Sequence, residues 1–292
     1  MNQLNFIEGM VALPTIFRHL LPDCGFHEKP AWFKSIVMKK IKIIISMLFL
    51  LAGFFVQAQE IAIGVRGGIS IPNLSASGSE QNPLNTGYSS RLGPEFGIFA
   101  EYKISDLFSI EPMVEYSSQG GKKNGMQAFP VPSDLAAMFP SGQAPAYLYA
   151  NFNSEAKINY LMIPVLAKFG YDFNESPFRI YIDAGPFVGF LLSAKQVTSG
   201  TSPIFLDPAG QNNLGIGSVN FDNTQDIKDQ LNSTNFGVEG NIGLGYKIGN
   251  SNIFIEFGGN YGFLNIQKGT ANGKNNTGAA TAVLGYSFWL GE

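Results

Sequence analysis

Along most of the chain, apolar and polar residues alternate with a period of two, which is the pattern of β-strands that have one apolar and one polar face. Eight segments show this alternation, and each is about as long as a strand of a membrane barrel. The segments are residues 60–71, 94–104, 107–117, 157–170, 178–194, 234–248, 252–266 and 279–290. In residues 107–117, for example, Phe108, Ile110 and Val114 share one face, whereas Glu111 and Glu115 share the other. The pattern predicts an all-β fold, an eight-stranded antiparallel up-and-down barrel.

The connections between these segments alternate in length. The short ones are 105–106, 171–177 and 249–251, and the long ones are 72–93, 118–156, 195–233 and 267–278. Short turns at one end and long loops at the other are typical of outer-membrane barrels, and a soluble up-and-down barrel has no need of such a bias. Alternation alone leaves two barrels open, because a soluble lipocalin-like barrel has its apolar face inside and a membrane barrel has it outside.

Aromatic residues gather near the strand ends on the apolar face. They are Tyr102, Phe108, Tyr116, Tyr246, Phe263, Tyr286 and Phe288. In membrane barrels, aromatic girdles lie at the level of the lipid headgroups. Packing inside a soluble core is the other explanation for such residues. Together with the loop lengths, they favour a transmembrane barrel.

The polar face is rich in glycine and carries charges of both signs. Because an isolated buried charge is costly, such groups must pair in a narrow lumen. We expect a structural network in the lumen that contains Arg66, Glu101, Lys103, Glu111, Glu115, Lys168, Arg179, Asp183, Glu239, Lys247 and Glu256. An interior of eight strands is just wide enough for side chains to fill it, so we do not expect a diffusion pore.

Residues 38–58 have the layout of a secretory signal peptide, with three early lysines, an apolar core of 14 residues and Val-Gln-Ala at 56–58. A membrane-spanning helix needs roughly 17 to 25 apolar residues, so this core is too short to be an anchor. We expect cleavage near Ala58/Gln59. Residues 1–37 are then a spurious or disordered leader ahead of a true start at Met38, and residues 59–292 form one outer-membrane barrel domain.

Composition removes several kinds of chemistry from that domain. Both histidines and the single cysteine precede residue 59, so Ser/His and Cys/His catalysis and His/Cys metal sites are excluded from it. With six of the 19 basic and three of the 22 acidic residues ahead of Gln59, the remainder has 13 basic and 19 acidic residues and a formal charge of −6. We therefore expect no catalytic residues, no cofactor, no metal and no nucleic-acid partner.

Two features of the long loops have alternative explanations. The stretch FDNTQDIKDQL (221–231) predicts a short helix with a solvated acidic face. A Ca²⁺ loop is the alternative, although the stretch lacks the glycine and the final glutamate of an EF-hand. The apolar residues of loop 118–156 either contact a protein partner or pack over the mouth of the barrel.

Several pieces of the sequence resemble the outer-membrane β-barrel proteins of Bacteroidetes, often labelled porin-like or PorT-like. They are IGVRGGIS, GIFAEYKISDLFSIEPMVEYSSQG, INYLMIPVLAKF, IYIDAGPFVGFLLSAK, FGVEGNIGLGYKI and LGYSFWL. The resemblance implies an eight-stranded barrel in the bacterial outer membrane, and a few members of that family are associated with type IX secretion. The chain departs from the pattern at Met162, where an acidic residue is expected, and in the length of loops 118–156 and 195–233.

The function that these observations predict is that of a non-enzymatic outer-membrane barrel. The expected partners are the bilayer and the lipopolysaccharide of the outer membrane, and a protein bound through loops 118–156 and 195–233. We expect a monomer with a role in secretion or envelope assembly. A transport channel for small solutes or lipids is the first alternative, and an envelope enzyme without histidine is the second.

Overall fold

The computed structural model describes residues 61–76, 83–269 and 273–291. The predicted leader and signal peptide lie outside these residues. The chain divides into two compact units. In the smaller unit, the described residues Pro132–Ala144 contain the one-turn helix α4 (Ser133–Ala136). Within the described ranges, no helix is both long and apolar enough to cross a membrane.

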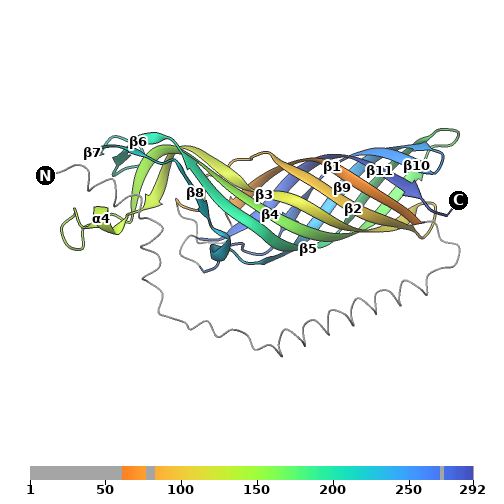
Figure 1. Cartoon of the computed structure of the whole chain (residues 1–292), viewed down its shortest axis with the longest axis horizontal. Coiled ribbons are helices and arrows are strands. Elements are labelled where there is room, and N and C mark those ends of the chain that lie inside the picture. Colours follow the sequence, from red (N-terminus) through yellow and green to blue (C-terminus); the bar gives the residue numbers. More distant parts are fainter. Residues whose placement is uncertain (1–60, 77–82, 270–272, 292) are drawn as a thin grey trace, which may run out of the picture. The chain divides into compact units, whose positions relative to one another are not determined.

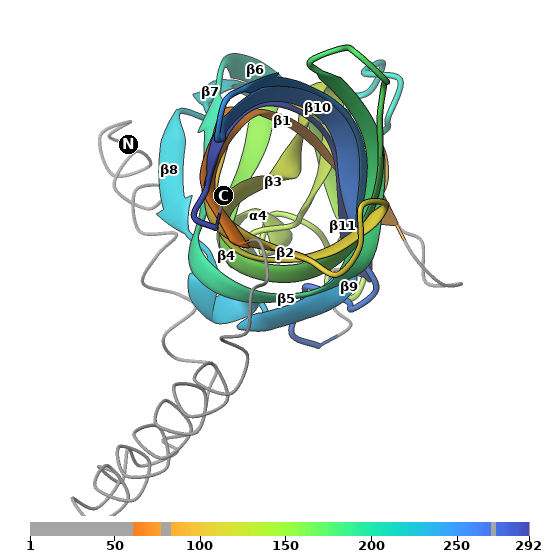
Figure 2. The ribbon, with the colours of Figure 1, turned by 90° about the vertical axis from the view of Figure 1, so that its right-hand side faces the viewer.

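In the larger unit, eight antiparallel strands close into a ring. Each strand pairs with its two neighbours in the ring, and the first strand pairs with the last over Ala62–Trp289 to Ala76–Asn275 (Figure 2). In ring order the strands are β1 (Ile61–Ala76), β2 (Gly93–Lys103), β3 (Phe108–Pro130), β4 (Tyr147–Asp172), β5 (Phe178–Ser199), β9 (Thr234–Ile248), β10 (Ser251–Gly262) and β11 (Asn275–Trp289). All eight predicted strands are thus present, and both chain ends of the ring lie at the end with the short turns.

The apolar face of the ring points outward. Ile98, Ile182 and Phe257 are more than half exposed, whereas their polar neighbours along the same strands are buried inside. Seven carboxylates and three cations are buried inside the ring among the described residues, namely Glu95, Glu101, Glu111, Glu115, Asp183, Glu239 and Glu256 with Arg66, Lys168 and Arg179. A soluble barrel has the reverse arrangement, so the sequence-based choice of the outward apolar face is confirmed.

The long connections differ from the prediction, because much of them is sheet. Residues 118–156 were expected to be a loop, yet β3 and β4 continue through them and pair as far as Pro130 and Tyr147 (Figure 1). Within 195–233 the chain forms β6 (Thr201–Phe205), β7 (Asn213–Asn220) and β8 (Asn223–Asp226). The residues that extend beyond the ring have no single apolar face, so hydrophobic alternation gives no signal for them.

Two smaller predictions are also wrong, one about a loop and one about the end of a strand. The stretch 221–231 is not a helix with an acidic face, because it contains strand β8 followed by the short 3₁₀ helix η1 (Lys228–Gln230). Strand β8 forms because backbone pairing with β5 at Lys195–Thr198 satisfies its polar main-chain groups. The seventh predicted strand, 252–266, ends at Gly262.

Candidate functional site

The interior of the ring is built on aromatic rings that lie over glycines of the neighbouring strand. Phe99, Tyr181 and Phe254 face Gly64, Gly243 and Gly285 in register. A Cβ atom at any of these glycines would lie only 2.0–2.2 Å from the facing ring. Glycine is needed at these positions because only a residue without a side chain leaves room for the ring. The rings pack with Met113 and Leu166 into one apolar cluster.

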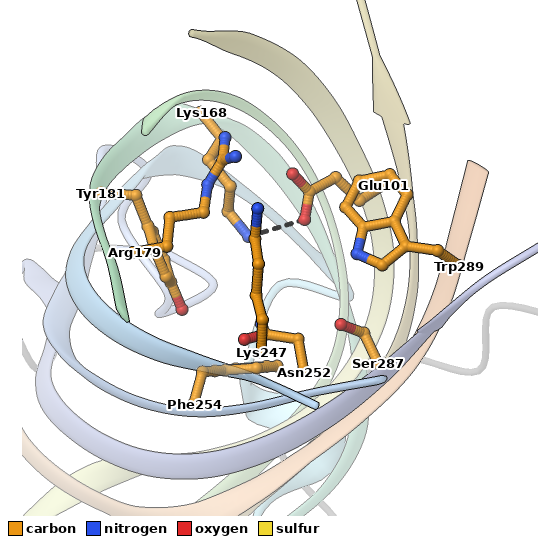
Figure 3. A pocket seen from close by; sticks show the side chains of 9 residues that line it. All are labelled: Glu101, Lys168, Arg179, Tyr181, Lys247, Asn252, Phe254, Ser287 and Trp289. Carbon is orange, nitrogen blue, oxygen red and sulfur yellow. Dashed lines mark hydrogen bonds and ion pairs between the residues drawn. The ribbon is translucent and has the colours of Figure 1, made fainter. Parts of the chain in front are cut away.

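Lys168 on β4 lies among these rings. Its Nζ atom is 4.4 Å from the centre of the Tyr181 ring and within 6 Å of the Phe99 and Phe254 rings. The ammonium also donates to Glu111, and it lies 3.4 Å from Glu101 Oε2 (Figure 3). The negative faces of the rings and the two carboxylates together hold the buried cation.

Arg66 on β1 is held by carboxylates from three other strands. Its Nη1 lies 3.0 Å from Glu256 Oε2, and its Nη2 lies 2.6 Å from Glu239 Oε1 and also contacts Glu115. The side chains of all four residues are at most 3 % exposed. We call this group the Arg66 clamp. Tyr181 connects it to the Lys168 group, because its hydroxyl donates to Glu256 Oε1 at 2.8 Å.

The remaining predicted lumen residues lie outside these two groups. Asp183 accepts a hydrogen bond of 2.8 Å from Asn241. Arg179 and Lys247 both contact Asp172 at the end with the short turns, where Lys247 is partly exposed. Lys103 lies at that end too and pairs with Asp106, whose side chain is 93 % exposed. Lys103 and Lys247 therefore belong to the rim of the lumen.

One interior group and one rim group are missing from the sequence-based set. Glu95 is buried and accepts from Ser117, and Asp172 bridges Arg179 and Lys247. Glu95 lies on the same polar face of its segment as Glu101, so the alternation could have identified it. Asp172 lies in the predicted turn 171–177, where no facing could be assigned.

Apolar side chains form a cluster at the loop end of the lumen. Leu74, Leu231 and Ile266 come from the ends of strands and from loops, and they pack onto Tyr160 and Phe187 of the ring wall. A bridge between Leu231 and Gln267 joins two of these loops. At the opposite end, the cavity shown in Figure 3 has a volume of about 10 Å³, enough for about one water molecule.

Two ionisable groups at the loop end have shifted pKa values. Burial lowers the pKa of Lys123 to about 8, and its ammonium donates to Leu84 O at 2.7 Å and lies over the Tyr88 ring. For Glu155, partial burial raises the pKa, but the hydrogen bond from Arg91 and the charges of Arg91 and Lys157 outweigh it, so that the pKa is below its usual value. Arg91 Nε lies 2.7 Å from Glu155 Oε1.

The described carboxylates of this interior are engaged by cations, amides and hydroxyls, as expected for a network of paired charges. In the described part of the chain, no group of three or more His, Cys, Asp or Glu residues is placed to hold a metal ion.

Comparison with known proteins gives a family and a set of distant structures. The family model described as "Outer membrane protein beta-barrel domain" matches residues 57–268. No curated protein matches the sequence. Among solved structures, Neisserial surface protein A is 17 % identical, with 78 % of this chain and 97 % of that chain covered and a TM-score of 0.33. OprG from Pseudomonas aeruginosa is 11 % identical, with 81 % and 98 % covered and a TM-score of 0.36. These two likenesses are too distant to indicate an activity.

Proposed function

We propose that this chain, which belongs to the outer membrane protein β-barrel domain family, is a closed barrel that crosses the bacterial outer membrane and presents its loop-end sheet to a partner. The observation that carries the proposal is the contrast between the two faces of the ring, with apolar side chains outside and paired charges inside. Lipid is the surrounding that makes such an outer face favourable.

The height of the apolar wall supports this setting. On β4, none of the outward positions from Leu161 to Tyr171 carries a charge, and they span 11 residues. They are Leu161, Ile163, Val165, Ala167, Phe169 and Tyr171. A strand tilted by about 45° needs roughly 9 to 11 residues to cross the hydrocarbon layer. In addition, a closed ring pairs each strand with two neighbours and leaves no open sheet edge, as a hydrocarbon environment requires.

The same interior favours a barrel that does not conduct. The Arg66 clamp and the Lys168 group cross the lumen, and apolar side chains form a cluster at its loop end. The test is planar-bilayer recording on protein that shows heat-modifiable mobility in gels. We expect no steady conductance, and a stable open level would instead favour a transport channel for small solutes or lipids.

The partner surface that we propose is the sheet beyond the ring. Strands β7 and β8 are its two edges, and edge strands offer unpaired backbone groups to an added strand. On the same part of the sheet, the ring of Phe221 stacks on that of Phe152 and meets that of Phe129 edge to face. Secretion or envelope assembly is the setting that we propose for such a partner, in line with the PorT-like resemblance.

Export by a cleaved signal peptide completes the proposal. Fractionation of the native cell envelope is expected to place the protein in the outer membrane, with an N-terminus at or near Gln59. Recovery of the protein from the periplasmic fraction would overturn the membrane proposal, and residues 1–37 on the mature chain would overturn the proposed cleavage.

A further inference from the structure

The outer face of β3, β4 and β5 changes from apolar to cationic within two rows of outward-facing residues. Tyr116, Leu161 and Phe190 form the last apolar row, in which each residue is paired in register with the next. Two residues further toward the loops, the row Ser118, Asn159 and Ser193 is polar. Its side chains form a chain of hydrogen bonds of 3.1 Å and 3.0 Å.

The next row carries two lysines that face each other. Lys157 on β4 is paired in register with Lys195 on β5, and both lie on the outer face. Like charges directly opposite each other in a sheet are destabilising. One step further, Lys122 of β3 is paired with Glu155. Lys228 of η1 lies close by and donates to Leu192 O at 2.8 Å. We call Lys122, Lys157, Lys195 and Lys228 the lysine patch.

Carboxylates on this face neutralise only part of its positive charge. Glu155 is shared between Lys157, at 3.5 Å, and the buried Arg91. Asp226 on β8 is paired in register with Lys195. Asp229 lies next to Lys228 in η1. The four lysines and Arg91 are thus accompanied by three carboxylates, which leaves an excess of two positive charges on this face. An anion bound between Lys157 and Lys195 would relieve their repulsion.

The height of the patch identifies the kind of anion. Lys157 is four residues from Leu161 of the last apolar row, a rise of about 13 Å along the strand and, at a tilt of about 45°, about 9 Å along the membrane normal. The flexible lysine side chains therefore bring their ammonium groups to the headgroup layer. Phosphates attached to lipid chains lie at this level of a bilayer, and lysine binds phosphate as a compact point charge. From this geometry, we propose that the lysine patch binds the phosphate groups of the lipid A part of lipopolysaccharide, with Lys157 and Lys195 as the central contacts. This proposal rests on the outer-membrane setting proposed above.

The test measures how much lipid A the purified, heat-modifiable protein retains, by native mass spectrometry with bisphosphorylated lipid A. We compare wild type with the double variant Lys157→Gln/Lys195→Gln. At about 1 kcal/mol per basic residue near a charged lipid surface, each lysine contributes about five-fold, so the double variant is expected to bind more than ten-fold more weakly. The double variant Lys157→Arg/Lys195→Arg keeps both charges and is expected to retain binding.

The matched control is Lys103→Gln/Lys247→Gln, which removes two charges from the rim at the end with the short turns and is expected to change binding less than two-fold. Equal binding by wild type and the Lys157/Lys195 glutamine variant would overturn the proposal. Equal retention of dephosphorylated lipid A would overturn it as well, because the acyl chains would then account for binding. Inorganic phosphate alone is expected to bind weakly, and displacement of lipid A by low millimolar phosphate would show a site for a free anion.

The heat-modifiable mobility of each variant separates folding from binding. A glutamine variant that loses this mobility is replaced by the single variants Lys157→Gln and Lys195→Gln, each expected to weaken binding about five-fold. If a folded protein fractionates with the outer membrane but its retention of lipid A does not depend on these lysines or on the phosphates, only the proposal for the lysine patch is overturned. Recovery from the periplasm overturns the membrane proposal first, whatever the lipid result.

Discussion

Removal of the cation from the Arg66 clamp is the most direct perturbation of the interior. Arg66→Met keeps a long side chain but leaves Glu115, Glu239 and Glu256 without their shared partner. Breaking a buried ion pair by removing one partner costs about 3 to 5 kcal/mol, because an uncompensated charge stays buried. Since three carboxylates share this guanidinium, we expect a loss in the upper half of that range.

The assay is equilibrium unfolding by urea in lipid vesicles, followed by the fluorescence of Trp289, the only tryptophan after residue 58. Heat-modifiable mobility gives an independent measure of the folded fraction. The matched control is Lys103→Met, because Lys103 is paired with the highly exposed Asp106. Exposed pairs contribute about 0 to 1 kcal/mol, so the control is expected to be nearly neutral.

The double variant Arg66→Met/Glu115→Gln tests the electrostatic cause. It removes one of the three stranded charges, so it is expected to recover part of the stability lost in Arg66→Met. If Arg66→Met unfolds within about 1 kcal/mol of wild type, the clamp does not hold the interior together and the reasoning is refuted. The same follows if the glutamine variant gives no recovery.

Three further predictions follow from other parts of the structure. Gly243→Ala is expected to cost about 1 to 3 kcal/mol in the same unfolding assay, because its Cβ would lie 2.1 Å from the Tyr181 ring. This loss of stability should be smaller in a Tyr181→Ala background. The control is Gly67→Ala, whose Cβ would have no atom closer than 3.8 Å. Burial lowers the pKa of Lys123 to about 8, so the unfolded segment binds more protons between that value and 10.5. Protection of residues 83–88 from hydrogen exchange should therefore rise with pH over this interval, and Lys123→Met should abolish the rise. Deletion of residues 201–220 is expected to leave heat-modifiable mobility intact, since none of the eight ring pairings uses them; loss of that mobility would show that the hairpin supports the ring.

The ring could be predicted from the sequence because one physical constraint acts on all of its residues. Each ring strand has one face against the crowded interior and one face outside, so alternation records the facing directly, as it does for Phe108 to Tyr116. The extension of β3 and β4 has no such contrast, because it pairs only with other strands beyond the ring. Its length depends on main-chain pairing, which the side-chain pattern does not record.

The interior charges were predictable as a set, but their partners were not. Alternation places Arg66 and Glu239 on polar faces, yet these residues are 173 positions apart. Their contact depends on strand tilt and on the register between strands that are not neighbours. The pairing of Tyr181 with Gly243 depends on the register between β5 and β9, which are neighbours in the ring but far apart in the chain, so the reason for that glycine appears only in the folded ring.

The Arg66 clamp has a consequence for the order of assembly. Arg66 lies on the first strand, and two of its three carboxylates lie on β9 and β10. In the chain, these two strands are followed only by β11. Until those strands arrive, Arg66 has at most Glu115 as a partner, and Glu239 and Glu256 have no guanidinium. A partly assembled sheet would therefore carry unbalanced charges into hydrocarbon, which is strongly unfavourable. The clamp thus couples membrane entry to completion of the whole sheet and selects against insertion of fragments.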